Sequence, residues 1–300
     1  MTTWRITSNT SRTIDDGRRR NLIINTGGGS ITITGGTPGS TAILIEIANV
    51  RGPELTIIDD ATTVSIGHLR NGTDWKQTIK DWVGVRGDVN VDLNITVPPG
   101  TDTSVRSLRA HTKISGLTGR LRVRGGTGSV RLDSLSGTID IITATADIEG
   151  KRISGDIKTK TASGNFSLDS SAPASVRANT VSGLSDLCLT GRSLITINSG
   201  AGDVRMRLPQ HQGYDLTAHS KTGHVMADGS TMINPLSEKR GGHRYDGDRS
   251  LAAKVKTVSG NIVLTRGETP HHSTPGVIIT GGQQPRGPIQ DTLPGDRKNN

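Results

Sequence analysis

The chain has 300 residues, of which 31% are hydrophobic and only 2% are aromatic, and it carries a formal charge of +9. Its 39 glycines bring the apolar share close to that of an ordinary globular protein, which argues against disorder along the whole length. The sequence contains 28 Ile and 18 Val against 21 Leu, and this β-branched excess favours strands over helices. The single cysteine, Cys188, excludes an internal disulfide, and its apolar surroundings predict a small strand residue rather than a nucleophile.

Residues 1–20 are polar and end in three arginines, which predicts a frayed start or a first strand around Trp4 to Thr7. This segment lacks the apolar core of a secretory signal, and later apolar runs are short, so we expect a cytoplasmic protein with no wall anchor and no membrane insertion. Alternating runs at 22–34, 42–48 and 54–66 predict early strands of one sheet system. Between them and the repeats, residues 71–82 carry Trp75 and Trp82 and could form a short helix or a loop, and we favour a loop that covers exposed strand edges.

A short repeat fills most of the remaining chain: a glycine followed by alternating side chains, every second of which is usually apolar. Alternation with a period of two places the apolar residues on one face of a strand, and the glycine provides a tight corner before it. The spacings are near multiples of nine residues, or of a coil of about 18 to 21 residues. The ten instances begin at Gly29, Gly87, Gly119, Gly128, Gly137, Gly155, Gly164, Gly202, Gly223 and Gly260.

Such a short strand cannot bury its apolar face alone, but coils stacked about 4.8 Å apart bury one continuous aliphatic interior. The predicted fold is therefore an all-β, single-domain parallel β-solenoid, similar to a β-helix, with irregular coils of about 18–21 residues. A narrow aliphatic interior also explains the scarcity of aromatic residues. An antiparallel sandwich is the alternative fold, and the scarcity of Asn-Gly turns, found only at Asn71-Gly72, counts against it.

Three tandem phrases, ISGDIKTKTASGNFSLDS, NSGAGDVRMRLPQHQGYDLTAHSKTGHVMADG and KVKTVSGNIVLTRG, resemble the DUF4097 putative-adhesin family, especially its actinobacterial form. That family has, in order, a strand ending in Arg-Leu-Pro, a short segment with Asp, a second Ser/Thr-Gly strand, an insertion and a final TxSGNI strand. The matching residues here are Arg207–Pro209, Asp215 and Ser259-Gly260, within a likeness that covers roughly residues 20 to 266. The resemblance implies a β-helix-like fold and supplies no catalytic residues.

The end of the repeat region is interrupted by residues 228–250, whose Gly, Pro, His and charged residues predict an inserted loop. After the last repeat, Pro, Gly, His, Gln and Asn dominate and predict a disordered tail. The predicted organisation is a polar segment over 1–20, a β-solenoid domain over 21–266 with the inserted loop 228–250, and the tail over 267–300.

The sequence lacks the usual catalytic and phosphate-binding motifs, so we predict no enzyme, no catalytic residue and no cofactor. We also predict no metal site: calcium-binding nonapeptides need an Asp where this chain has Val130, and no Cys or close carboxylate completes a tetrahedral set with His211, His219 and His224. A polysaccharide lyase or hydrolase is the enzyme hypothesis, and it requires paired acids on an outer face. The outward acids instead fall at predicted corners or strand ends, where turns favour them: Asp133, Asp140, Asp156, Asp169 and Asp203.

The strongest local feature is a basic run, with seven Lys or Arg residues and no Asp or Glu from Arg106 to Arg131. Alternation places Val123, like Val204 in a later unit, in the interior, and the neighbouring arginines outside. Coils stacked in register would then form a basic stripe suited to an anionic polymer, nucleic acid or phospholipid headgroups, although basic residues also simply keep a strand face soluble. The candidate polyanion-binding residues are Arg120, Arg122, Arg124, Lys158, Lys160, Arg205 and Arg207.

These observations predict a noncatalytic, adhesin-like interaction or scaffold protein whose partner is an unidentified protein or an anionic polymer. A polyanion-binding module that uses the basic stripe is the second hypothesis, and a polysaccharide-cleaving enzyme is the third. End-to-end self-association is a further interaction that stacked coils allow.

Overall fold

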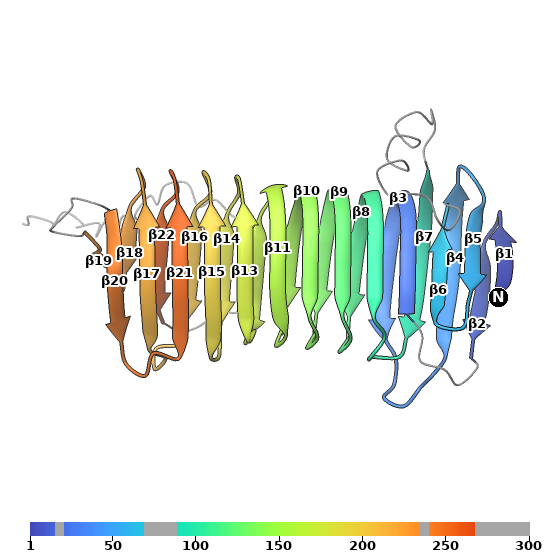
Figure 1. The fold of residues 1–300 in the computed structure, drawn as a ribbon, viewed down its shortest axis with the longest axis horizontal. Coiled ribbons are helices and arrows are strands. Elements are labelled where there is room, and N and C mark those ends of the chain that lie inside the picture. The colour runs from blue at the N-terminus through green and yellow to red at the C-terminus, as the bar shows by residue number, and fades with distance from the viewer. Residues whose placement is uncertain (16–20, 69–88, 234–239, 268–300) are drawn as a thin grey trace, which may run out of the picture. The chain divides into compact units, whose positions relative to one another are not determined.

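A computed structural model describes residues 1–15, 21–68, 89–233 and 240–267, and Met1–Thr269 form one compact unit. The described residues contain strands and turns without a helix, which confirms the all-β prediction. The strands belong to one continuous sheet (Figure 1). The loop predicted around Trp75 and Trp82 and the tail predicted after Gly267 lie outside the described residues.

The sheet comprises two walls of strands, which the long strands β3, β8, β9 and β10 connect because each runs through both. Wall A contains, in order of pairing, β1 (Thr2–Ile6), β5 (Leu55–Asp59), β6 (Thr63–Gly67), the first halves of β3 (Asn21–Gly35), β8 (Thr103–Ser115), β9 (Leu121–Asp133) and β10 (Ile139–Lys151), then β11 (Asp156–Ser163), β13 (Ser175–Thr180), β15 (Ser193–Ser199), β21 (Leu251–Thr257), β17 (Tyr214–Ser220) and β20 (Arg240–Asp246). Wall B contains β2 (Thr10–Ile14), β4 (Ile43–Arg51), β7 (Asn90–Val97), the second halves of the four long strands, then β12 (Phe166–Ser171), β14 (Ser185–Leu189), β16 (Val204–Leu208), β22 (Ile262–Arg266), β18 (Val225–Ala227) and β19 (Ser230–Thr231).

Parallel pairing with a constant offset builds the middle of both walls. Val105 pairs with Val123, and Val123 with Ile141, each 18 residues further along the chain. From β11 to β16 the offset is 19 residues, as between Lys158 and Arg177. These offsets agree with the repeat length predicted from the sequence.

The interior is one aliphatic cluster to which both walls contribute. In β9, Val123 is 1% exposed in wall A and Val130 is 3% exposed in wall B, so the inward residues change from odd to even numbers where the strand crosses the corner. Val204 is fully buried, and Cys188 is a buried free thiol on β14. The predicted inward positions are therefore confirmed.

A buried hydroxyl explains the recurring Ser/Thr-x-x-Gly phrase at the corner between the walls. The hydroxyls of Ser199, Ser220 and Thr257 accept hydrogen bonds from the N–H groups of the glycines three residues later, at 2.8–3.0 Å. At Gly164 the backbone has a φ of +120°, and a Cβ there would lie 2.2 Å from the carbonyl oxygen of Ala146. Only glycine fits this corner without strain.

The two ends differ from the all-parallel prediction, because antiparallel strands close them. β1 pairs with β5 and β2 with β4 at one end, whereas β20 pairs with β17 and β19 with β18 at the other. An uncovered edge of a regular parallel stack would be a template for further strands, and irregular terminal strands reduce that risk. The segments predicted as a polar start and an inserted loop thus contain β1, β2, β19 and β20.

Chain order and spatial order also differ at two places. β3 lies between β6 and β8 in wall A, and the final pair β21–β22 lies between β15–β16 and β17–β18.

Arg266, at the end of β22, forms ion pairs of 2.7 Å with Asp228 and 2.6 Å with Asp246. Tyr214, fully buried, donates its hydroxyl to Asp228 at 3.0 Å. Burial and the Asp228 carboxylate raise the pKa of this phenol.

Candidate functional site: the basic rows of wall A

Two rows of outward side chains cross wall A because the strands keep their register from β8 to β21. Row 1 contains Ser104, Arg122, Asp140, Lys158, Arg177, Thr196 and Lys254. Row 2, two residues further along each strand, contains Arg106, Arg124, Ile142, Lys160, Asn179, Asn198 and Lys256. These basic rows hold eight cations and one acid. At about 4.8 Å per strand, they extend for about 29 Å.

The one acid, Asp140, forms an ion pair with an arginine of the same rows. Its carboxylate accepts a hydrogen bond from Arg124 at 2.7 Å, with side-chain exposures of 26% and 30%. The hydrogen bond from Arg124 lowers the pKa of Asp140 against the opposing effect of burial, and the charges of Arg124, Lys158 and Arg122 lower it further. Asp140 is therefore an ionised partner of Arg124 at neutral pH.

The other seven cations of the basic rows have no carboxylate of the described residues within 4.0 Å. Two of them, Lys158 and Arg177, lie directly beside each other on adjacent strands, and Arg106 lies beside the paired Arg124. Like charges at directly paired positions destabilise a sheet. Wall A therefore accumulates positive charge that its own side chains do not neutralise.

On wall B, two arginines form ion pairs with acids on neighbouring strands. Arg131 pairs with Glu149 at 3.1 Å and Arg207 with Asp186 at 3.0 Å, each across neighbouring strands. Cross-strand ion pairs of this kind keep a face polar without a large net charge. Acids thus lie among the cations of wall B, whereas the basic rows of wall A hold a single acid.

The seven residues predicted from the sequence therefore do not form one stripe. Arg122, Arg124, Lys158 and Lys160 lie in the basic rows, and Arg120 directly precedes β9 beside them. Arg205 and Arg207 lie on β16 of wall B, because the chain crosses a corner between β15 and β16.

Four cations of the basic rows were not among the predicted residues: Arg106, Arg177, Lys254 and Lys256. Arg106 and Arg177 follow from the 18- and 19-residue offsets from Arg124 and Lys158. The signal for the two late lysines is the likeness of KVKTVSGN to IKTKTASGN, which aligns Lys254 with Lys158 and Lys256 with Lys160.

A surface hollow of about 490 Å³ lies at the N-terminal ends of these strands, and Arg120, Arg122, Lys158 and Arg177 are its basic lining residues. Its acids have internal partners: Asp140 binds Arg124, and Asp156 accepts a hydrogen bond from the Ser175 hydroxyl at 2.7 Å. The nearby Asp102 accepts the backbone N–H of Arg120 at 2.8 Å. The hollow therefore presents cations to an incoming anion.

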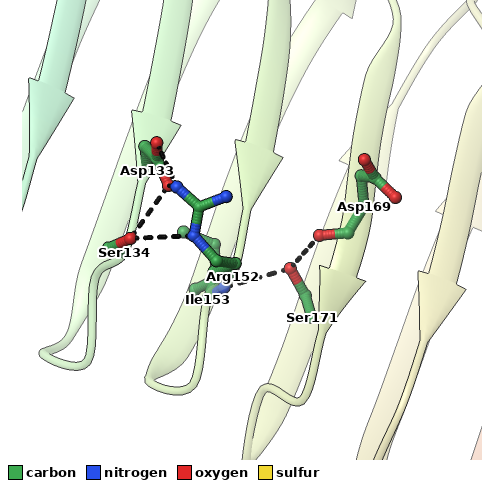
Figure 2. A network of polar contacts seen from close by, with 6 residues as sticks. All are labelled: Asp133, Ser134, Arg152, Ile153, Asp169 and Ser171. Atoms are coloured by element: carbon green, nitrogen blue, oxygen red, sulfur yellow. Dashed lines mark hydrogen bonds and ion pairs between the residues drawn. The ribbon is translucent and has the colours of Figure 1, made fainter. Parts of the chain in front are cut away.

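The acids outside the basic rows also have structural partners. Figure 2 shows Asp133 in contact with Arg152 and Ser134, beside a chain of hydrogen bonds from Ile153 N–H to Ser171 (3.1 Å) and from Ser171 to the carbonyl of Asp169 (2.9 Å). Asp203 accepts the N–H of Asn261 at 2.8 Å, which aligns adjacent strands. The carboxylates of Asp133 and Asp203 thus hold a corner and a strand end in place.

The three histidines considered for metal binding are distributed over different parts of the fold. His219 lies on β17 of wall A, His224 directly precedes β18 of wall B, and His211 is in the turn after β16. Among the described residues, no group of three or more His, Cys, Asp or Glu side chains is placed to hold a metal ion. A search of the same residues found no helix long and apolar enough to span a membrane.

Comparison with known proteins finds no matching family model and no matching curated protein. A "putative cell adhesion protein" from Clostridium sporogenes aligns with 87% of this chain and 100% of its own, at 13% identity and a TM-score of 0.29. A "putative adhesin" from Bacteroides fragilis aligns over 86% and 98%, at 15% identity and a TM-score of 0.49. A "putative lipid binding protein" from Parabacteroides distasonis aligns over 86% and 97%, at 9% identity and a TM-score of 0.33. At these values none of the likenesses identifies a partner for this chain.

Proposed function

We propose that the chain is a noncatalytic β-solenoid of the putative-adhesin type, that it serves as an interaction protein, and that the basic rows are its binding surface for polyanions. The constant strand offset and the common core of the two walls support the solenoid form. The observation that carries the function is the contrast between the walls: Arg131 and Arg207 of wall B pair with acids on neighbouring strands, whereas seven cations of the basic rows lack an ionic partner among the described residues.

This contrast has an energetic consequence. Each like-charged pair on neighbouring strands costs a few tenths of a kcal/mol up to about 1 kcal/mol in the free protein. A bound polyanion removes that repulsion and releases its own condensed counterions, so the same side chains that weaken the sheet favour binding. Binding along the side of the stack is our proposal over end-to-end self-association, because antiparallel strands close both ends.

Heparin chromatography with two matched double variants tests this proposal. K158S/R177S removes a neighbouring pair from the basic rows, and K113S/R205S removes one lysine and one arginine that are exposed on wall B. We expect K158S/R177S to elute at lower salt, with a salt slope reduced by about two units. K113S/R205S has the same net charge and should elute close to the parent. An equal shift in both variants, or none in either, contradicts the proposal.

We also propose that the protein is noncatalytic, because the acids of this surface form hydrogen bonds or ion pairs with neighbouring side chains. A hydrolase needs two carboxylates free to act on one bond, whereas Asp140, Asp156 and Asp133 are held by Arg124, Ser175 and Arg152. The measurement is the release of reducing ends from polygalacturonate by the full chain. Sustained release, abolished by a single Asp→Asn change on wall A, would favour the enzyme instead.

A further inference from the structure

Exposed hydrophobic side chains gather on the same side of the molecule as the basic rows. The described residues contain seven large hydrophobic side chains that are exposed. Five of them lie on the outer side of wall A or at its corner: Ile142 (37%), Val181 (65%), Leu194 (52%), Tyr245 (57%) and Val258 (54%). The other two are Met1, which precedes β1, and Ile233, which follows β19 of wall B.

Three of these side chains lie in row 2 or directly beside it. Ile142 occupies row 2 between Arg124 and Lys160. Val181 and Val258 each lie two residues beyond row 2, where β13 and β21 end at the corner.

Backbone hydrogen bonds align the corner residues into a line parallel to row 2. The N–H of Ser182 donates to the carbonyl of Ala162 at 3.0 Å, that of Ala201 to Val181 at 2.8 Å, and that of Val258 to Gly200 at 3.0 Å. An exposed aliphatic corner therefore runs beside row 2, which contains Lys160 and Lys256.

A soluble polyanion would leave this corner uncovered. Sugar chains and nucleic acid backbones present charge but no aliphatic surface, and the aromatic side chains on which nucleic acid bases stack are missing from both basic rows. An anionic lipid surface supplies both kinds of contact, because negative headgroups lie directly above the acyl chains. Charge and apolar surface together thus select one class of partner.

We infer that the partner of the basic rows is an anionic phospholipid surface, on which wall A docks with the corner valines, Val181 and Val258, reaching below the headgroups. This inference rests on the proposed function, since it names the polyanion. Docking is peripheral: the cations stay at the level of the headgroups, and the backbone stays outside the acyl region.

Co-sedimentation of the full chain with vesicles tests the inference. We use phosphatidylglycerol mixed with phosphatidylcholine, and phosphatidylcholine alone as the uncharged surface. The parent should bind the anionic vesicles and not the neutral ones. V181S/V258S should bind the anionic vesicles at least tenfold more weakly, because the burial of four methyl groups is lost, yet should elute from heparin like the parent. V263S changes a half-buried valine on wall B and should bind vesicles like the parent.

The outcomes separate the two proposals. If V181S/V258S binds the vesicles as tightly as the parent while K158S/R177S still elutes early from heparin, the lipid inference fails and the polyanion proposal stands. If K158S/R177S changes neither assay, both fail. Unchanged melting of V181S/V258S and V263S would show that both variants keep the fold. If V263S weakens vesicle binding as much as V181S/V258S does, the corner valines are not the lipid contact.

Discussion

Placing a carboxylate at Val123 tests the assignment of inside and outside in wall A. Val123 is 1% exposed on β9, and its partners on the adjacent strands, Val105 and Ile141, are fully buried. An aspartate there would enter an aliphatic layer that holds no counter-charge. Its neighbour Arg122 is exposed on the outer side of the same strand and provides the matched position.

The cost has two parts. Loss of the buried valine side chain costs about 1.5–3 kcal/mol. Keeping a carboxyl with an ordinary pKa of about 3.9 protonated at pH 7 costs about 4 kcal/mol more, at 1.36 kcal/mol per pH unit. The total of about 6 kcal/mol is comparable to the whole stability of many domains, which is about 5–15 kcal/mol.

Urea unfolding of V123D, V123N and R122N separates these parts. R122N should stay within about 0.5 kcal/mol of the parent, and V123N should lose the burial term. V123D should be less stable than V123N at pH 7. Burial raises the folded-state pKa of the new carboxyl, so its extra cost grows as pH rises above the unfolded pKa and disappears below about pH 3.9. If V123D is as stable as R122N at pH 7, position 123 does not face the core.

Two further predictions concern Asp140 and a corner glycine. Because Arg124 lowers the pKa of Asp140, this pair contributes stability above the ordinary pKa of 3.8, and the contribution is lost as pH falls through the lowered pKa. D140N should therefore melt lower than the parent at pH 7, by about 1 kcal/mol of stability, and the two melting curves should converge in strong acid; a difference that persists there would contradict the ion pair. G164A should lose about 2–4 kcal/mol, because the φ of +120° and the Ala146 carbonyl leave no room for a Cβ. G267A, which meets nothing within 4 Å, is the control, and equal melting of the two variants would show that the corner can relax.

The sequence by itself determined the local structure of each repeat. Alternation with a period of two identified Val123 and Val204 as inward residues, and the structure confirms their burial. The same period put Arg122, Arg124, Lys158 and Lys160 outside, because the pleat of a strand leaves no other choice once the apolar face is fixed. The repeat length followed from the spacing of the corner glycines.

Only the tertiary structure decided which strands are neighbours. Long-range hydrogen bonding places β21 beside β15, 58 residues away along the chain, so Lys254 and Lys256 extend the basic rows although no constant spacing points to them. The corner between the walls reverses the alternation and carries Arg205 and Arg207 to wall B, beside Asp186. The periodicity within a strand shows which side a residue faces. A binding surface shared by several strands depends instead on which strands pair, and insertions and corners make these pairings unreadable from the spacing along the chain.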